Sequence, residues 1–212
     1  MSESPQQTAP GTSVPDSIVI DTDIIEDGRP IQLCLRPLSV SDHDRIERGI
    51  MGLSEQSRYL RFFSGFKAAP KSLVEQLTAV DGVNHIGWGA VNLGIEGQPA
   101  MGAVHAIRQS EDETTGEFAI AVLDQYHGKG VARALVAALF LNCVRRGMRE
   151  LDIAVMRENT KGAHLVSVLT AKSTHSDGPV VYSRLDLQNA LNALRAMENP
   201  YWLQEVFAAF GE

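Results

Sequence analysis

The sequence predicts an α/β protein of the α+β type, in which a mixed central sheet of about six to seven strands is flanked by helices. Alternating apolar runs recur along the chain, and three of them stand close together as an antiparallel meander. The last of these runs is followed by a glycine-containing loop and a long apolar helix. With 212 residues, the chain is long enough for one sizeable domain with a full hydrophobic core.

The first half of the predicted domain opens with a hairpin. Residues 17–24 and 31–37 alternate well enough for two strands, and Asp27-Gly28 forms the turn between them. Three helices are expected next, at residues 39–51, 54–63 and 72–80. The first of them has a start signal, because Ser41 stands three residues before Asp44.

The second half combines the meander with a parallel return strand. The meander strands are expected at residues 85–93, 99–107 and 115–123. A strong helix prediction covers residues 130–146, which are rich in Ala and Leu and are stopped by Gly147. The later elements are a strand at 151–156, a helix at 160–171, a strand at 180–187, and helices at 189–197 and 202–210.

This reading divides the chain into three parts. Residues 1–16 are rich in Pro, Ser, Thr and Gln and are expected to form a disordered tail. Residues 17–187 form the folded domain, and residues 188–212 form a C-terminal helical extension. The extension is expected to cover the domain's own core, with docking of a partner or a second copy as the alternative, so that the protein is a monomer or a homodimer.

Composition excludes several classes of function. The net charge of -7 argues against nucleic-acid binding, which needs a basic surface, and is compatible with a cationic acceptor such as an amine. No apolar run approaches the roughly 20 residues of a membrane helix, so no membrane association is expected. Cys34 and Cys143 make neither a disulfide framework nor a metal-binding spacing, and the histidines show no ligand spacing, which favours a reducing cytoplasm and no metal.

The loop QYHGKGVA, residues 125–132, offers three interpretations. A dinucleotide-binding loop would need Gly or Ala at position 133, where this chain has Arg, and an ATP or GTP phosphate loop would need Ser or Thr after Lys129, where it has Gly130. The remaining interpretations are a cradle for the pyrophosphate of another ligand and a plain strand-to-helix turn. Glycines allow close backbone approach, and the amides that open the following helix suit an anion.

The loop resembles that of the GNAT superfamily of acetyltransferases. Gln125-x-x-Gly128-x-Gly130-x-Ala132 is similar to the Q/R-x-x-G-x-G/A motif whose backbone amides bind the pyrophosphate of acetyl-CoA in that family. The order of elements also resembles that fold over about residues 30–187, and LSEQSRYLRFFS, residues 53–64, resembles a segment of the bacterial protein-lysine acetyltransferase branch. The resemblance implies acetyl-CoA as the acetyl donor and an acceptor protein such as an acyl-CoA synthetase.

The same resemblance implies roles for individual residues. Glu117 matches the position of the proposed general base, and the alternation of a strand places it on one face with Ala119 and Ala121. A base is needed because a lysine with a pKa near 10.4 is protonated at pH 7, at a cost of about 4 to 5 kcal/mol. Asn159 matches an asparagine that contacts the cofactor. The backbone that holds the oxyanion and the loop that holds the pyrophosphate are expected at Ile120, Ala121, Val122, Gln125, His127, Gly128, Lys129, Gly130, Val131 and Ala132.

Two departures from the family leave the function open at this stage. The family commonly follows the Asn helix with a Tyr that protonates the leaving thiolate and then a Gly-Phe, whereas this chain reads VSVLTAKSTHSDGPVVYSRL. Tyr182 is the candidate to replace that acid, with a structural role as the alternative. The favoured function is acetylation of a protein lysine; the alternatives are acetylation of a small amine and a catalytically silent acetyl-CoA-binding regulatory module.

Overall fold

A single mixed sheet runs through the protein in the computed structural model, which describes residues 14–212. Within these residues, eight strands lie in the order β1-β2-β3-β4-β5-β6-β8-β7, and only β5 and β6 pair in parallel. The strands are β1 (Ile18–Glu26), β2 (Arg29–Pro37), β3 (His85–Asn92), β4 (Ala100–Ile107), β5 (Thr115–Val122), β6 (Glu150–Met156), β7 (Lys172–Asp177) and β8 (Val180–Asp186). The predicted fold class is confirmed.

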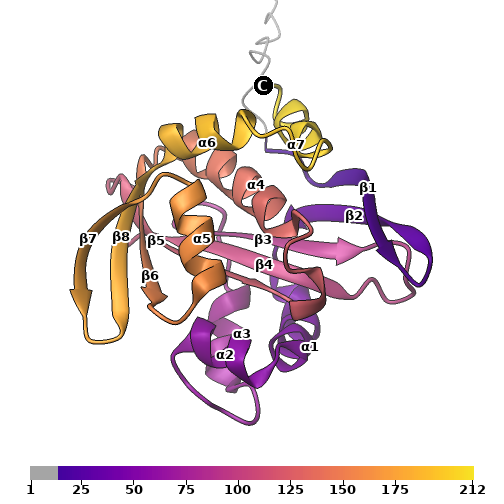
Figure 1. Cartoon of the computed structure of the whole chain (residues 1–212), viewed down its shortest axis with the longest axis horizontal. Coiled ribbons are helices and arrows are strands. Elements are labelled where there is room, and N and C mark those ends of the chain that lie inside the picture. Colours follow the sequence, from indigo (N-terminus) through magenta and orange to yellow (C-terminus); the bar gives the residue numbers. More distant parts are fainter. Residues whose placement is uncertain (1–13) are drawn as a thin grey trace, which may run out of the picture.

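Helices cover both faces of the sheet (Figure 1). They are α1 (His43–Gly52), α2 (Glu55–Phe62), α3 (Lys71–Thr78), α4 (Val131–Arg145), α5 (Thr160–Val168), α6 (Leu187–Arg195) and α7 (Leu203–Ala209). The first three lie together below the sheet in Figure 1, whereas α4 and α5 lie on the opposite face and α6 and α7 pack on α4. No helix among residues 14–212 combines the length and the apolar character that crossing a membrane requires.

The sheet has one strand more than expected. β7 was missed because all six of its residues, KSTHSD, are exposed, so that no alternation of apolar and polar residues marks it. It forms the edge of the sheet and pairs only with β8. A polar edge strand of this kind is one way in which proteins avoid edge-to-edge aggregation.

The start of the first helical region also differs from the prediction. The capping pair is Ser39 and Asp42, rather than Ser41 and Asp44, and it opens a 3-10 turn (Val40–Asp42) that leads into α1. Asp42 is buried, and its carboxylate accepts hydrogen bonds from the Ser39 amide at 3.1 Å and from Arg36 and Arg45. All three partners lie within six residues of Asp42 in the sequence, and together they fix the start of the helical region at Ser39.

The core extends from the first hairpin to the last helix. α4 is almost wholly buried, and its Phe140 ring lies 5.6 Å from Phe118 of β5. Trp202, Phe207 and Phe210 belong to the same buried cluster, so the C-terminal helices pack on the core that the sheet and α4 share. The predicted tail of residues 1–16 lies outside the described residues as far as residue 13, and Val14 is half-buried against the core.

Candidate active site

The candidate site is a cleft that forms where β5 and β6 separate. The two strands pair in parallel from Thr115 to Glu117 only, opposite Glu150 to Asp152. β5 continues to Val122 along β4, yet no residue of β6 within the described chain pairs with it beyond Glu117. Backbone groups on that side of β5 are therefore available to a ligand, and the cleft between the strands has a volume of about 1380 Å³.

The glycine loop closes one end of this cleft. After a 3-10 turn (Asp124–Tyr126), Gly128 and Gly130 adopt left-handed conformations with φ of 73° and 88°, and α4 begins at Val131. Both glycines and Ala132 line the cleft. The first amides of a helix have no intrahelical acceptor, and Gly130 has no side chain that could cap them. This geometry suits the phosphate groups of a ligand.

The two glycines have different surroundings. A Cβ at Gly128 would meet nothing within 4 Å, so the approach to its backbone is open. A Cβ at Gly130 would lie 2.6 Å from Cγ of Pro200 and 3.1 Å from Cζ2 of Trp202. The segment between α6 and α7 therefore packs against the loop at Gly130. Arg133 adds a second contact, because it donates a 2.9 Å hydrogen bond to the Asn199 carbonyl in the same segment.

Asp124 joins the loop to α2. Its carboxylate accepts hydrogen bonds from the Ser54 amide at 3.0 Å, the Ser54 hydroxyl at 2.9 Å and the Ser57 hydroxyl at 2.7 Å. Burial opposes ionisation of this carboxyl group, but the hydrogen bonds outweigh it and lower the pKa of Asp124 to about 2. The charge therefore fixes the N-terminus of α2 against the loop at neutral pH.

The Asp124 contact is expected to contribute stability that depends on pH. Because the folded-state pKa is lower than the unfolded value near 3.9, the contribution is present above about pH 4 and is lost as the pH falls toward 2. Urea unfolding should show that Asp124→Asn is less stable than the wild type at pH 7 and that the difference shrinks between pH 4 and 3. Asp177→Asn, on the exposed strand β7, is the control. An equal destabilisation at every pH would contradict this role.

A second anchor holds the loop to the first hairpin. The Tyr126 hydroxyl donates to the Glu26 carboxylate at 2.9 Å, Asn92 donates to the same carboxylate at 2.8 Å, and Gln125 donates to it at 3.3 Å. The Gln125 side chain therefore belongs to the support of the loop. Burial, together with the neighbouring Glu26, raises the pKa of Tyr126.

His127 connects the loop to α5. Its Nε2 lies 2.8 Å from the Val122 carbonyl oxygen, and its Nδ1 lies 2.7 Å from Nζ of Lys161. The contact with the carbonyl requires a hydrogen on Nε2, because a carbonyl oxygen can only accept. Lys161 lines the cleft together with His127, and it brings a positive charge to the loop. Sequence reasoning missed Lys161, although its place directly after Glu158-Asn159-Thr160 was a usable signal.

The other predicted loop residues divide into two groups. Ile120, Ala121 and Val122 line the cleft along β5. Lys129 is exposed with its Nζ 6.0 Å from the centre of the Tyr126 ring, and Val131 is fully buried in the core. Neither of these two side chains lines the cleft, so Val131 offers only its backbone amide to a ligand there.

Glu117 lies at the opposite end of the cleft from the loop. Its side chain is exposed, and among residues 14–212 it has no hydrogen bond or ion pair. Its neighbour in register is Asp152 of β6, whose carboxylate is held by Arg184 in two hydrogen bonds of 2.7 Å and 2.8 Å. Arg184 therefore pairs with the carboxylate next to Glu117, whereas Glu117 itself faces the cleft without such a partner among residues 14–212.

Two further predicted residues lie on the β6 side of the cleft. Asn159 caps α5, because its Oδ1 accepts a 2.8 Å hydrogen bond from the Gly162 amide, and its NH₂ group remains available as a donor to a ligand. Tyr182 is half-buried on β8 and stacks on His175 of β7, with ring centres 4.4 Å apart. In the sheet, β6 lies between β5 and β8. Tyr182 is therefore two strands away from β5.

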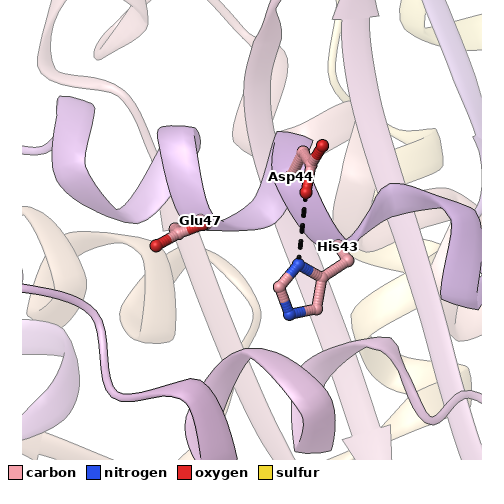
Figure 2. A group of neighbouring side chains, drawn as sticks. All are labelled: His43, Asp44 and Glu47. Carbon is pink, nitrogen blue, oxygen red and sulfur yellow. Dashed lines mark hydrogen bonds and ion pairs between the residues drawn. The ribbon is translucent and has the colours of Figure 1, made fainter.

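A group of possible metal ligands lies outside the cleft. His43, Asp44 and Glu47 of α1 have ligand atoms within 4.8 Å of one another, and His43 Nδ1 lies 3.4 Å from Asp44 (Figure 2). The helical spacing of His43 and Glu47 was not recognised in the sequence. None of the three residues lines the cleft, and the two acidic residues are exposed. This arrangement is that of a solvated helix face.

The sequence is similar to two curated acetyltransferases. It is 28% identical over 153 residues to Acetyltransferase Pat of Mycolicibacterium smegmatis, a match that covers 72% of this chain and 45% of that protein. It is 27% identical over 127 residues to Acetyltransferase PA5475 of Pseudomonas aeruginosa, covering 60% of this chain and 67% of that protein. The chain therefore spans less than half the length of the first of these relatives.

Solved structures share the fold. The GNAT domain of S. lividans PAT superposes with a TM-score of 0.69 and 23% identity, over 80% of this chain and 96% of that one. Spermidine N-acetyltransferase from Vibrio cholerae, solved with CoA and spermine, superposes with a TM-score of 0.58 and 18% identity, over 76% and 98%. The model of the Acetyltransferase (GNAT) family matches residues 55–167, which is more than half of the sequence. The chain belongs to the GNAT family of acetyltransferases.

Proposed function

We propose that this protein transfers the acetyl group of acetyl-CoA to a primary amine, with the ε-amino group of a protein lysine as the favoured acceptor. One observation carries the proposal: the cleft between β5 and β6 has the glycine loop at one end and the unpaired carboxylate of Glu117 at the other. From Glu117 to Val122 the extended strand spans about 17 Å. This length suits a pantetheine arm that runs from the loop to a reacting thioester.

Different groups in the cleft would have different roles in the reaction. Amides at Gly128, Gly130 and the start of α4 would bind the pyrophosphate, with Lys161 adding positive charge. The free side of β5 near Ile120 would hold the thioester oxygen through a backbone amide. The amine nitrogen forms a bond to the acetyl carbon, the CoA thiolate leaves, and the amine gives up one proton, for which Glu117 is the proposed acceptor.

The surface beside the cleft supports a protein acceptor. Tyr59 and Phe63 are 41% and 46% exposed, and they are four residues apart at the end of α2. Phe63 also lines the cleft. Aromatic side chains are enriched in protein interfaces, so this exposed pair supports a protein acceptor. The similarity to Acetyltransferase Pat adds support, and an acyl-CoA synthetase is the acceptor protein that we propose to test first.

A small amine is the second candidate acceptor. The spermidine N-acetyltransferase shares the fold, and the carboxylates of Glu117 and Glu158 line the cleft of this chain, which would favour a cationic substrate. Release of CoA from acetyl-CoA should be measured with free polyamines, lysine peptides and a folded acyl-CoA synthetase, with acetyl-CoA binding followed in parallel. Turnover with the folded protein alone supports the proposal, whereas turnover with polyamines alone selects the second candidate. Binding without turnover indicates a silent regulatory module.

Tyr182 is expected to make a small contribution to turnover. Its place on β8, two strands from β5 and stacked on His175, is more suited to supporting the sheet than to protonating the leaving group. A thiolate with a pKa near that of free Cys can leave without a proton. Tyr182→Phe should therefore lower kcat by less than about tenfold, since general acid catalysis typically contributes about 10² or more. A loss of about a hundredfold or more in steady-state assays would assign Tyr182 as the acid.

A further inference from the structure

Arg61 is a cation without a partner at the wall of the cleft. Its Nε is buried and has no hydrogen-bond partner, and its guanidinium takes part in no ion pair within the described part of the chain. Its guanidinium lies 4.8 Å from the centre of the neighbouring Phe62 ring. Burial lowers the pKa of Arg61 to about 10, so the side chain remains charged at neutral pH. The residue as a whole is half-buried and lines the cleft, so its charge is accessible to a ligand there.

Arg61 separates the cleft from a second, smaller cavity. This cavity, of about 60 Å³, lies between the sheet and the helices α1 to α3. Leu53, Arg61 and Ala121 line both spaces, so the cavity adjoins the cleft at the part of β5 where the acyl group of the thioester is proposed to lie. Most of the remaining lining is apolar or small, as at Ile50, Gly102 and Ala103.

The other charged groups of the cavity already have partners. Arg36 and Arg45 both donate to Asp42, at 2.5 Å and 2.6 Å. His105 lies 3.0 Å from His85 through its Nδ1, and burial, with Arg61 and His85 nearby, holds the pKa of His105 well below its usual range. The cavity therefore has two arginines that share one carboxylate, a neutral histidine pair and Arg61, and it has an excess of positive charge.

We infer that Arg61 binds a carboxylate group that the substrate brings into the active site. A planar carboxylate can accept two hydrogen bonds from a guanidinium, and burial strengthens such a pair. Two sources have this chemistry: the far end of a dicarboxylic acyl chain such as succinyl, or an acidic side chain next to the target lysine of the acceptor. The inference rests on the proposed acyl transfer and adds the substrate class to it.

The test compares substrates that differ only in the carboxylate. The full chain is assayed with acetyl-CoA and succinyl-CoA, and with matched lysine peptides that carry Glu or Gln beside the lysine. The variants are Arg61→Gln, Arg61→Lys, and Arg48→Gln on the exposed surface of α1 as a charge-matched control. The Kd of each acyl-CoA and each peptide is measured by titration calorimetry, independently of turnover.

The wild type is expected to prefer one carboxylate-bearing substrate over its neutral counterpart by about tenfold or more in KM or Kd. Arg61→Gln should abolish this preference by weakening the carboxylate-bearing substrate about tenfold more than its neutral counterpart, Arg61→Lys should restore part of it, and Arg48→Gln should retain it. A preference for succinyl-CoA identifies the acyl chain as the source, and a preference for the Glu peptide identifies the acceptor. Equal loss for all substrates in Arg61→Gln, or no preference in the wild type, overturns the inference. If nothing is turned over, the proposed function fails, whereas the Kd values still decide the inference.

Discussion

Replacing Glu117 by glutamine is expected to lower kcat by about 10²–10⁴-fold, the range typical of general acid–base catalysis. Glutamine has the same shape but cannot take a proton from the incoming ammonium group. Glu117 makes no hydrogen bond or ion pair within residues 14–212, so the change should leave folding and acetyl-CoA binding intact. CoA release and acetyl-CoA titration, performed on the same preparations, separate the two effects.

The pH profile gives an independent readout of the same role. Without a base, the variant depends on the fraction of amine that is already neutral, so its rate should rise about tenfold per pH unit toward the lysine pKa near 10.4. Glu111→Gln, in the exposed loop before β5, is the matched control and should behave as the wild type. A Glu117→Gln enzyme with wild-type kcat at pH 7 would show that Glu117 is not the base.

Replacing Gly130 by alanine is expected to weaken acetyl-CoA binding by at least about tenfold and to lower the free energy of unfolding by more than about 1 kcal/mol. The left-handed φ of 88° is unfavourable for alanine, and the added Cβ would lie 2.6 Å from Cγ of Pro200. Either the loop or the segment between α6 and α7 must move, and the helix amides move with the loop. Calorimetric titration and urea unfolding measure the two losses.

Gly147→Ala is the control for this variant. Gly147 follows α4 at its other end with a φ of 81°, and a Cβ there would meet nothing within 4 Å. It should reproduce the strain of the left-handed conformation while leaving acetyl-CoA affinity unchanged. If Gly130→Ala and Gly147→Ala lose the same stability and neither loses affinity, Pro200 does not support the loop in the way described.

The elements that could be predicted from the sequence are those with local signals. The hairpin at Asp27-Gly28, the meander and α4 each have their own turn residues or apolar pattern, and all three are present at the expected places. The loop of residues 125–132 could be recognised because its glycines are needed for a backbone conformation, φ above zero, that the structure shows at Gly128 and Gly130. β7 could not be predicted, because its six exposed residues are held only by pairing with β8.

The parts of the site that escaped prediction depend on contacts between distant residues. Three different regions of the chain support the glycine loop, through Glu26, Ser54 and Pro200. Their distances from the loop in the sequence follow no pattern from which these contacts could be predicted. Arg61 lies within the recognisable segment of residues 53–64, but its lack of a counter-charge is visible only when every neighbour is known. The sequence therefore indicates the residues that are expected to contact a ligand better than it indicates the residues that hold them in place.

Hydrogen exchange with and without acetyl-CoA tests the central claim most directly, because it locates the ligand on the chain without requiring turnover or a known acceptor. The account predicts slower exchange at the amides of residues 120–122 and 128–132, with little change on the exposed strand β7. Protection confined to other segments, or none at saturating acetyl-CoA, would contradict the assignment of this cleft as the acetyl-CoA site.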